Sequence, residues 1–295
     1  MEALLSLAFD NLSSFDGPKI RKGLRQVEGL LAQICLSNGG APKHSRSSSN
    51  SSTKIEEDGE APASPPRKDL AQLTQDPAFR EFFKLQEGFE WNVAMRLINT
   101  LDRLMAKGSD GQNDLLILSA LDLIQGALLL HPPSKQLFSR EQNMNLLLDL
   151  LEPYNCPAIQ SATLLTLVVA LIDTPSNTRT FEGLDGLLTV TSLFKSRNTA
   201  REVKLKLVEF LYFYLMPEAP SSTPSEKRDS SIPVLQRSPS KLGGPLDASK
   251  QKRSNTNNGI LSTEEKQQLL SRHLSSVEDL VKDLRNCAPF GGMVC

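Results

Sequence analysis

The 295-residue sequence has little of the chemistry that marks metal sites, disulfide frameworks or nucleic-acid binding. Its four cysteines are widely scattered, and their spacing matches neither a zinc site nor a disulfide scaffold. The formal net charge of −1 gives no bulk attraction to nucleic acid or to an anionic membrane. The sequence therefore predicts a protein of the reducing cytoplasm, with no metal site and no nucleic-acid partner.

Motifs of catalysis and of cofactor binding are also missing from the sequence. It contains no P-loop, no Gly-rich dinucleotide loop, no H-E-x-x-H and no G-x-S-x-G. His44, His131 and His273 have no neighbouring Cys, Ser or carboxylate in the arrangement of a catalytic pair. His131 precedes Pro132 and is interpreted as a residue at a helix C-terminus. We expect a binding protein with no catalytic residues and no cofactor.

Segments typical of membrane insertion or secretion are lacking too. The opening MEALLSLAFDNLSSF has neither the positive flank nor the cleavage site of a signal peptide. The most apolar run, residues 158–172, is too short to span a bilayer. Cys295 stands last, so the ending GGMVC is no prenylation box. These features predict a soluble, cytoplasmic protein with no direct membrane insertion.

Composition divides the chain into segments that can pack and segments that cannot. Two stretches are rich in Ser, Pro, Asn and Gly and poor in large aliphatic residues, so they cannot offset the entropy cost of ordering. The predicted organisation is N-terminal helices (1–37), a disordered insertion (38–68), helical repeats (69–216), a disordered linker (217–260), a C-terminal amphipathic helix (261–286) and a flexible tail (287–295).

An internal echo indicates the fold class. The stretch LLLHPPSKQLF ends at Phe138, and a second apolar run with a Pro-Ser turn reaches Phe181, 43 residues later. The same shift aligns Leu164 with Leu207, and no alternating strand pattern interrupts the helical periodicity. A period of this length is typical of armadillo and HEAT repeats, whose helical units stack because one unit cannot bury its own apolar face. The sequence predicts an all-α, armadillo/HEAT-like solenoid.

The predicted C-terminal helix has an amphipathic pattern. Ser262 or Thr263 supplies an N-cap, and aliphatic residues follow at alternating spacings of four and three, the seam of a coiled coil. This helix either folds back as a cap over the aromatic run EFLYFYL of the last repeat, or docks a partner helix. The candidate partner-binding residues are Tyr212 and Tyr214 of the aromatic run and Leu274, Val277 and Val281 of the C-terminal helix.

Two further clusters have both a structural and a functional interpretation. Four phenylalanines lie between Phe79 and Trp91, the only tryptophan. Core packing is the default for this cluster, and Phe79 and Trp91 are candidate partner-binding residues only if their rings are exposed. The basic run comprising Lys195, Arg197, Arg201 and Lys204 is either a solvated helix face or a site for an acidic partner or phosphate.

Three blocks of sequence resemble a known family. They are IRKGLRQVEGLLAQICL, DPAFREFFKLQEGFEWNVAMRLINTLDRLM and REVKLKLVEFLYFYLMPE, within residues 1–36 and 70–220. They look like the fungal cell division control protein fourteen family of the septation initiation network. That family is distinct from the phosphatase of similar name, and no H-C-x-x-x-x-x-R loop is present.

The resemblance implies a function. Family members are non-catalytic subunits that bind a germinal-centre-type protein kinase, support its activity and place it at the spindle pole body in cytokinesis. Spindle-pole scaffold proteins are therefore further candidate partners. No binding residues are carried over from the family. The alternative is a stand-alone scaffold without a dedicated kinase, whose concave surface holds extended peptides.

The two Ser-rich stretches contain candidate phosphorylation sites. Ser64 and Ser238 match the proline-directed pattern with a basic residue at plus three, and Thr223 matches it more weakly. Ser49, in the run HSRSSS, resembles the substrate preference of a basic-directed kinase. Phosphorylation in an exposed segment adds about −1.5 to −2 charges and creates or blocks docking.

Overall fold

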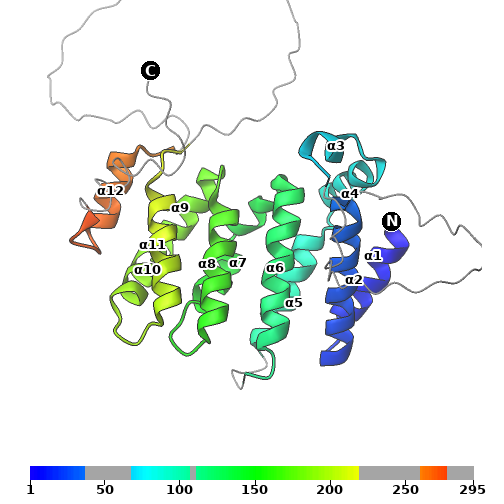
Figure 1. The fold of residues 1–295 in the computed structure, drawn as a ribbon, viewed down its shortest axis with the longest axis horizontal. Helices are drawn as coiled ribbons and strands as arrows, with labels where there is room; N and C mark the ends of the chain where they lie inside the picture. Colours follow the sequence, from blue (N-terminus) through cyan, green and yellow to red (C-terminus); the bar gives the residue numbers. More distant parts are fainter. Residues whose placement is uncertain (37–67, 107–110, 219–259, 278–295) are drawn as a thin grey trace, which may run out of the picture.

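The computed structural model describes residues 1–36, 68–106, 111–218 and 260–277 (Figure 1). Within these ranges the regular elements are all helices, so the predicted all-α class is confirmed. The elements are α1 (Glu2–Leu12), α2 (Gly17–Cys35), α3 (Leu70–Gln75), α4 (Pro77–Glu87), α5 (Val93–Met105), α6 (Asp114–Leu130), the 3-10 helix η1 (Pro132–Ser139), α7 (Glu141–Asp149), α8 (Pro157–Leu171), α9 (Pro175–Gly183), α10 (Gly186–Lys195), α11 (Arg201–Leu215) and α12 (Thr263–Ser271).

The predicted disordered insertion, disordered linker and flexible tail fall almost entirely outside the described residues. The same holds for one candidate residue of the C-terminal seam and for all four candidate phosphorylation sites. These positions are Val281, Ser49, Ser64, Thr223 and Ser238.

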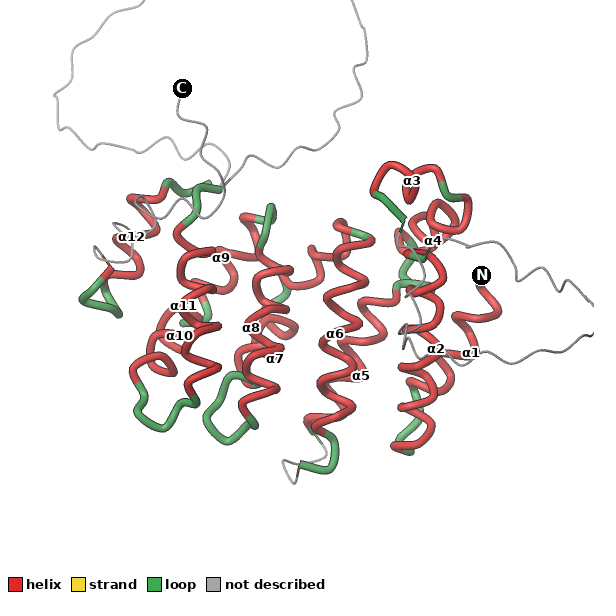
Figure 2. Tube along the Cα trace, in the orientation of Figure 1, coloured by secondary structure: helices red, strands yellow, loops and turns green. Residues whose placement is uncertain are grey.

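The long helices form a row. Figures 1 and 2 show α2, α6, α8 and α11 side by side, with adjacent members in contact. Shorter helices, among them α5 against α6 and α10 against α11, make a second layer. All four long helices run in the same direction, so their C-terminal ends gather along one edge of the row (Figure 1). We call this the C-terminal edge.

The 43-residue repetition is present in the backbone. His131 has φ −132° and ψ 80°, and Thr174, 43 positions later, has φ −134° and ψ 76°. Each precedes a proline that opens a short helix, η1 or α9, and these two helices pack against each other. Phe138 and Phe181, the residues of the sequence echo, are both fully buried. The assignment to the armadillo/HEAT class itself stays a prediction.

Hydrogen bonds also join residues of successive units, at a spacing close to the 43-residue repeat. Asn92 Nδ2 donates to Ser134 Oγ at 2.9 Å, and Asn177 Nδ2 donates to the Lys135 carbonyl at 2.8 Å. Each bond spans 42 residues and lies in the buried interior. Because a buried amide without a partner is costly, these side chains fix how each unit sits on its neighbour.

Helix α8 lies at the centre of the row, between α6 and α11. Its sequence carries no charge, and Leu164 and Leu167 are buried to 1% and 0% exposure. Coverage by two neighbours explains the missing polar stripe only in part, because Leu165 on the open side remains 50% exposed. The open side of this helix is therefore apolar as well.

The described residues that flank segments 37–67 and 219–259 lie close together at the C-terminal edge. Lys68 N–H donates to the Cys35 carbonyl at 2.9 Å, which brings the two ends of segment 37–67 together. Leu261 N–H donates to Glu218 Oε2 at 2.9 Å, which does the same for segment 219–259. Hydrogen bonds therefore connect the described parts of the chain directly across these two segments.

Candidate functional site

The segment 260–277 packs on the last helix of the row, α11. In the run EFLYFYL of α11, Phe210 and Tyr214 are each 1% exposed, while Tyr212 is half-buried. Leu270, Leu274 and Val277 of the late segment are buried too. This placement agrees with the capping alternative. Partner binding by Tyr214, Leu274 or Val277 stays a prediction, and it requires the segment to move away.

The late segment is not the continuous helix that the sequence predicts over residues 261–286. Helix α12 ends at Ser271, and residues 272–276 are not helical, so Leu274 lies between two turns rather than on a helical seam. The backbone N–H groups of both His273 and Leu274 donate to the Leu270 carbonyl, which closes the helix. The ammonium group of Lys195 in α10 donates a hydrogen bond to the His273 carbonyl. This long-range contact stabilises the turn that follows α12.

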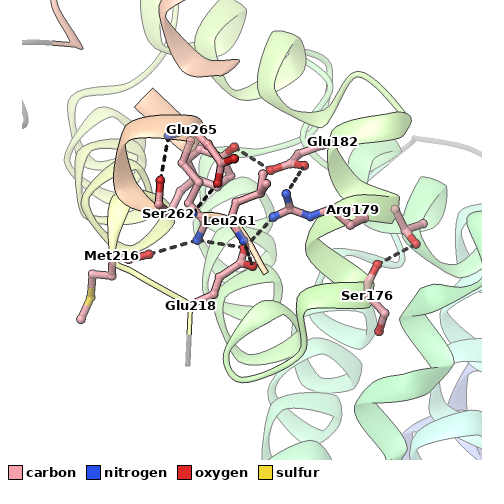
Figure 3. A network of polar contacts seen from close by, with 11 residues as sticks. Ser176, Arg179, Glu182, Met216, Glu218, Leu261, Ser262 and Glu265 are labelled. Atoms are coloured by element: carbon pink, nitrogen blue, oxygen red, sulfur yellow. Dashed lines mark hydrogen bonds and ion pairs between the residues drawn. The ribbon is translucent and has the colours of Figure 1, made fainter. Parts of the chain in front are cut away.

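The start of α12 is capped as the sequence predicts. Ser262 Oγ accepts a hydrogen bond from Glu265 N–H at 3.3 Å, and Glu265 Oε2 accepts one from Ser262 N–H at 2.9 Å (Figure 3). This reciprocal pair satisfies two backbone donors that a helix N-terminus leaves without an intrahelical partner. Of the two residues considered from sequence, Ser262 is the N-cap.

Lys266 anchors α12 to the C-terminal edge. Its side chain is 5% exposed, and its ammonium lies 3.1 Å from Glu218 Oε1. The ammonium also donates to the Met216 carbonyl at the end of α11, 3.0 Å away, and lies 5.2 Å from the centre of the Tyr214 ring. A cation at the C-terminal end of a helix is stabilised by the helix dipole and by the free carbonyls there.

Glu218 connects this anchor to the preceding unit. Its side chain is 8% exposed, and Oε1 also accepts from Arg179 Nη2 of α9 at 2.5 Å. Arg179 Nη1 in turn lies 3.1 Å from Glu182 Oε2, and Tyr214 donates its hydroxyl to Glu182 Oε1 at 2.6 Å. Figure 3 shows these contacts converging between α9, α11 and α12. Two cations and two carboxylates balance, so the buried cluster is neutral.

Burial sets the protonation of this cluster. Desolvation by burial raises the pKa of Glu182 and lowers the pKa of Lys266, because burial disfavours the charged form of each. Burial, followed by the hydrogen bond to Glu182, raises the pKa of Tyr214, so its phenol stays protonated. A buried ion pair contributes little net stability but is costly to break on one side. The cluster therefore specifies where the late segment docks.

A cavity of about 160 Å³ adjoins the polar cluster. Residues from the ends of α8 and α11, the start of α9, and α12 line it. In the described ranges, no group of three His, Cys, Asp or Glu side chains is placed to hold a metal ion. No helix among the described residues is long and apolar enough to cross a membrane.

The aromatic cluster between Phe79 and Trp91 divides between core and surface. Phe82 is fully buried, whereas Phe79 and Trp91 are half-buried and pack against the core. The Trp91 ring stacks on Phe9 of α1 with 6.2 Å between centroids. Phe89 is the exposed member, at 77%. A partner-binding role for Phe79 and Trp91 stays a prediction, and both rings already take part in joining α1 and α4 to the row.

The basic run is also divided by the structure. Lys195 holds the late segment through the His273 carbonyl, as described above. Arg197 and Arg201 are exposed, and Lys204 is half-buried. The solvated-face interpretation fits Arg197 and Arg201, while Lys195 has a structural contact that its sequence neighbours do not indicate.

His131 is the C-cap residue of α6, as the sequence indicates, but it is buried. It is 3% exposed, its Nδ1 lies 2.8 Å from Ser134 Oγ, and its ring meets Phe83 edge-on at 4.5 Å. Burial lowers the pKa of His131, so the neutral imidazole predominates at pH 7. Packing, rather than attraction of a cation to the helix dipole, therefore explains this position.

Sequence reasoning missed the residues of the buried polar cluster. Glu218 lies at the start of the predicted disordered linker, and Arg179 and Glu182 lie in an ordinary polar helix. Lys266 carries no local signal either, because the alternating seam extended back from Leu270 reaches Gln267 and not Lys266.

Taken together, the row of helical units and the closing segment define an all-α protein of stacked helices. The family model described as "Cell division control protein 14, SIN component" matches residues 1–290, so the chain belongs to this family, as the resemblance predicted. A curated relative is the cell division control protein 14 of Schizosaccharomyces pombe. It is 28% identical over 300 residues, an alignment that covers 99% of this chain and 97% of that protein. No solved structure matches the chain.

Proposed function

We propose that the chain is a non-catalytic subunit that binds a germinal-centre-type protein kinase and supports its activity in septation initiation signalling during cytokinesis. The kinase–subunit complex acts at the spindle pole body in mitosis. The observation that carries the proposal is membership of a cell division control family of the septation initiation network, across residues 1–290.

The fold is compatible with a binding role of this kind. A row of stacked helices holds its exposed side chains in fixed relative positions, so a partner pays little of the entropy cost of ordering them. At the α11 end of the row, a neutral polar cluster fixes the late segment. The remaining surface is then available to a partner without local unfolding.

The proposal is tested by stoichiometry and by activity. The chain is purified from its own cell at mid-mitosis, and co-purifying proteins are quantified by mass spectrometry. We expect one germinal-centre-type kinase in near-equimolar amount, whose phosphorylation rate rises when the purified chain is added. Leu167→Asp serves as the unfolded control and should lose both effects.

Two results would contradict the proposal. One is the absence of any kinase near equimolar amount, with many substoichiometric proteins instead, which favours the stand-alone scaffold. The other is a kinase that binds at equimolar ratio but has the same activity with and without the chain, which leaves only a passive tether.

A further inference from the structure

The open side of α8 carries an uncharged stripe along the whole helix. Leu165 is 50% and Ile172 39% exposed, and the rest of the stripe is exposed or half-buried. A 15-residue helix is about 22 Å long, so the stripe extends over roughly four turns. We call this surface the α8 stripe; its residues are Ala158, Ser161, Ala162, Leu165, Val168 and Ile172.

The neighbouring helices extend this apolar surface. On α6, Leu115 is 71% and Leu129 62% exposed, and on α11 Leu205 is 58% exposed. Figure 1 shows these three helices next to one another in the row. Exposed leucines on three adjacent parallel helices exceed the scattered single residues that a solvated surface tolerates. Such a group of exposed apolar side chains is typical of an interaction site.

A carboxylate borders the middle of the stripe on the α6 side. Asp122 of α6 is exposed and occupies the position 43 residues before Leu165, so it lies at the same level of the row. On α11 the equivalent position is Val208, and the neighbouring Glu209 is paired with Lys206 at 2.7 Å. A ligand that covers Leu165 therefore meets negative charge at its α6 edge. Positive charge on that edge of the ligand would complement it.

An extended peptide does not fit this surface. Its backbone N–H and C=O groups need hydrogen-bond partners when buried. Ser161 is the only polar side chain of the α8 stripe. The nearby amide of Gln125 already donates to Thr166 Oγ1 at 3.0 Å and to the Ala162 carbonyl at 3.3 Å. A helix satisfies its own backbone groups, so a helix is the ligand that this surface accepts.

A second copy of this chain is disfavoured in one arrangement. A face-to-face dimer centred on Leu165 has its two-fold axis in the interface. If the axis runs across the helices, Asp122 meets Asp122 of the second copy, which opposes self-association. If it runs along α8, Asp122 meets the level of Val208 and of the Lys206–Glu209 pair, and the crosslinking test below decides this case.

We propose that the α8 stripe, with the exposed leucines of α6 and α11, is the docking surface for an amphipathic helix of the kinase. The ligand helix carries aliphatic side chains on one face and Lys or Arg along the border of that face that lies next to Asp122 of α6. This inference rests on the proposed function, since it names the surface that the kinase contacts.

The first test compares two substitutions at equally exposed leucines. Leu165→Asp places a carboxylate in the middle of the stripe, and Leu188→Asp places one on α10, where Leu188 is 46% exposed. Binding to the purified kinase is titrated by interferometry, and melting is followed by circular dichroism. We expect Leu165→Asp to weaken binding at least tenfold with unchanged melting, and Leu188→Asp to bind as the wild type.

A charge variant tests the chemistry of the ligand. Asp122→Lys should weaken kinase binding about three- to tenfold and reduce its sensitivity to salt, because one attractive pair at the border becomes repulsive. Asp102→Lys, at an exposed aspartate of α5, is the matched control and should leave the affinity unchanged. An affinity that rises in Asp122→Lys would overturn the predicted ligand charge.

Photo-crosslinking identifies the ligand independently of any loss of affinity. A benzoylphenylalanine at position 165 should crosslink to a kinase segment with aliphatic residues at i, i+3, i+4 and i+7, and one at position 188 should not. Crosslinks from position 165 to this chain itself would instead assign the surface to a second copy or to the chain's own C-terminal residues.

The outcomes separate this inference from the proposed function. A wild-type chain that fails to bind the kinase removes the proposed function. A kinase that binds the wild type and Leu165→Asp equally well keeps the proposed function but removes the α8 stripe as its docking surface. A crosslinked segment without helical spacing also removes the inference.

Discussion

The two ends of the helical row are closed in different ways. At the N-terminal end, α1 directly precedes α2 in the chain and covers it with apolar residues, including Leu5, Phe9 and Leu12. At the C-terminal end, the cover is the segment 260–277, which is separated from α11 by residues 219–259. That cover is held by buried ion pairs as well as by apolar contacts.

The difference follows from connectivity. A helix that is adjacent in sequence needs little beyond apolar packing to find its position, because the short connection limits the alternatives. A remote segment can dock in more ways, and directed polar contacts such as Lys266 with Glu218 select one of them. The N-terminal closure should therefore respond to changes in shape, and the C-terminal closure to changes in charge.

We expect the largest loss of stability for a substitution at the centre of the row, because the helices on both sides pack against α8. Leu167→Asp places a charge at a fully buried position of α8, and an unpaired buried charge costs several kcal/mol. We expect cooperative unfolding at a temperature lower by ten degrees or more, measured by circular dichroism. Leu165→Asp on the open side of the same helix is the control and should melt as the wild type. Equal melting of the two variants would remove the central position of α8.

The C-terminal closure should be weakened by truncating one side chain, that of Glu218. Glu218→Ala leaves Arg179 and Lys266 buried without their shared carboxylate, which costs about 3 kcal/mol unless the late segment detaches first. We expect increased proteolysis within residues 260–277 and a lower melting temperature. Combining Glu218→Gln with Lys266→Met removes both charges of the pair and should restore much of the loss. A double variant no better than Glu218→Ala would show that the charges do not fix the segment.

The N-terminal closure is tested by substituting two glycines of α2. A Cβ on Gly23 would lie 2.9 Å from the backbone nitrogen of Leu12 in α1, whereas a Cβ on Gly29 meets nothing within 4 Å. Alanine is favoured over glycine in a helix by about 1 kcal/mol. Gly29→Ala should therefore raise the melting temperature, and Gly23→Ala should lower it through the clash with α1. If both variants gain stability, α1 does not pack as closely as described.

We expect the smallest change in stability from the titration of His131, which is buried as a neutral imidazole. Burial lowers the pKa of His131 below the ordinary 6.5, so the unfolded chain binds this proton more tightly than the folded chain. Stability should fall as the pH drops below about 6.5 towards the lowered pKa. Urea unfolding at pH 7.5 and pH 5.5 measures this loss, and His131→Asn should make it smaller. A variant that loses as much stability as the wild type would assign the pH dependence to other groups.

Much of the fold follows from periodicity, and less of the candidate site does. The 43-residue echo predicts the equivalent positions of Phe138 and Phe181, and the capping pattern at Ser262 predicts the start of α12. Helix periodicity states which residues face inward, because that depends on local spacing. It does not state which remote residue an inward side chain meets. Glu218 and Lys266 are paired across residues 219–259, and nothing local indicates their contact.

Remote contacts also explain why the late segment is not one continuous helix. The spacing of Leu270, Leu274 and Val277 fits a continuous helix, yet turns separate these three buried residues. Lys195 of α10 reaches the His273 carbonyl, a contact that depends on how α10 lies in the finished fold. Tertiary contacts thus override a local pattern here, whereas they reinforce it in α8.

The central claim is that the C-terminal closure stabilises the protein while the open face of α8 binds its partner. One set of titrations tests it: kinase affinity and melting temperature for Leu165→Asp and for the double variant Leu274→Ser with Val277→Ser. The account predicts that Leu165→Asp melts as the wild type but loses at least tenfold in affinity. It predicts that the double variant melts lower but, below its melting temperature, binds within about threefold of the wild type. The reverse result, in which the double variant loses the kinase and Leu165→Asp keeps it, would contradict the account and place the binding site at the late segment.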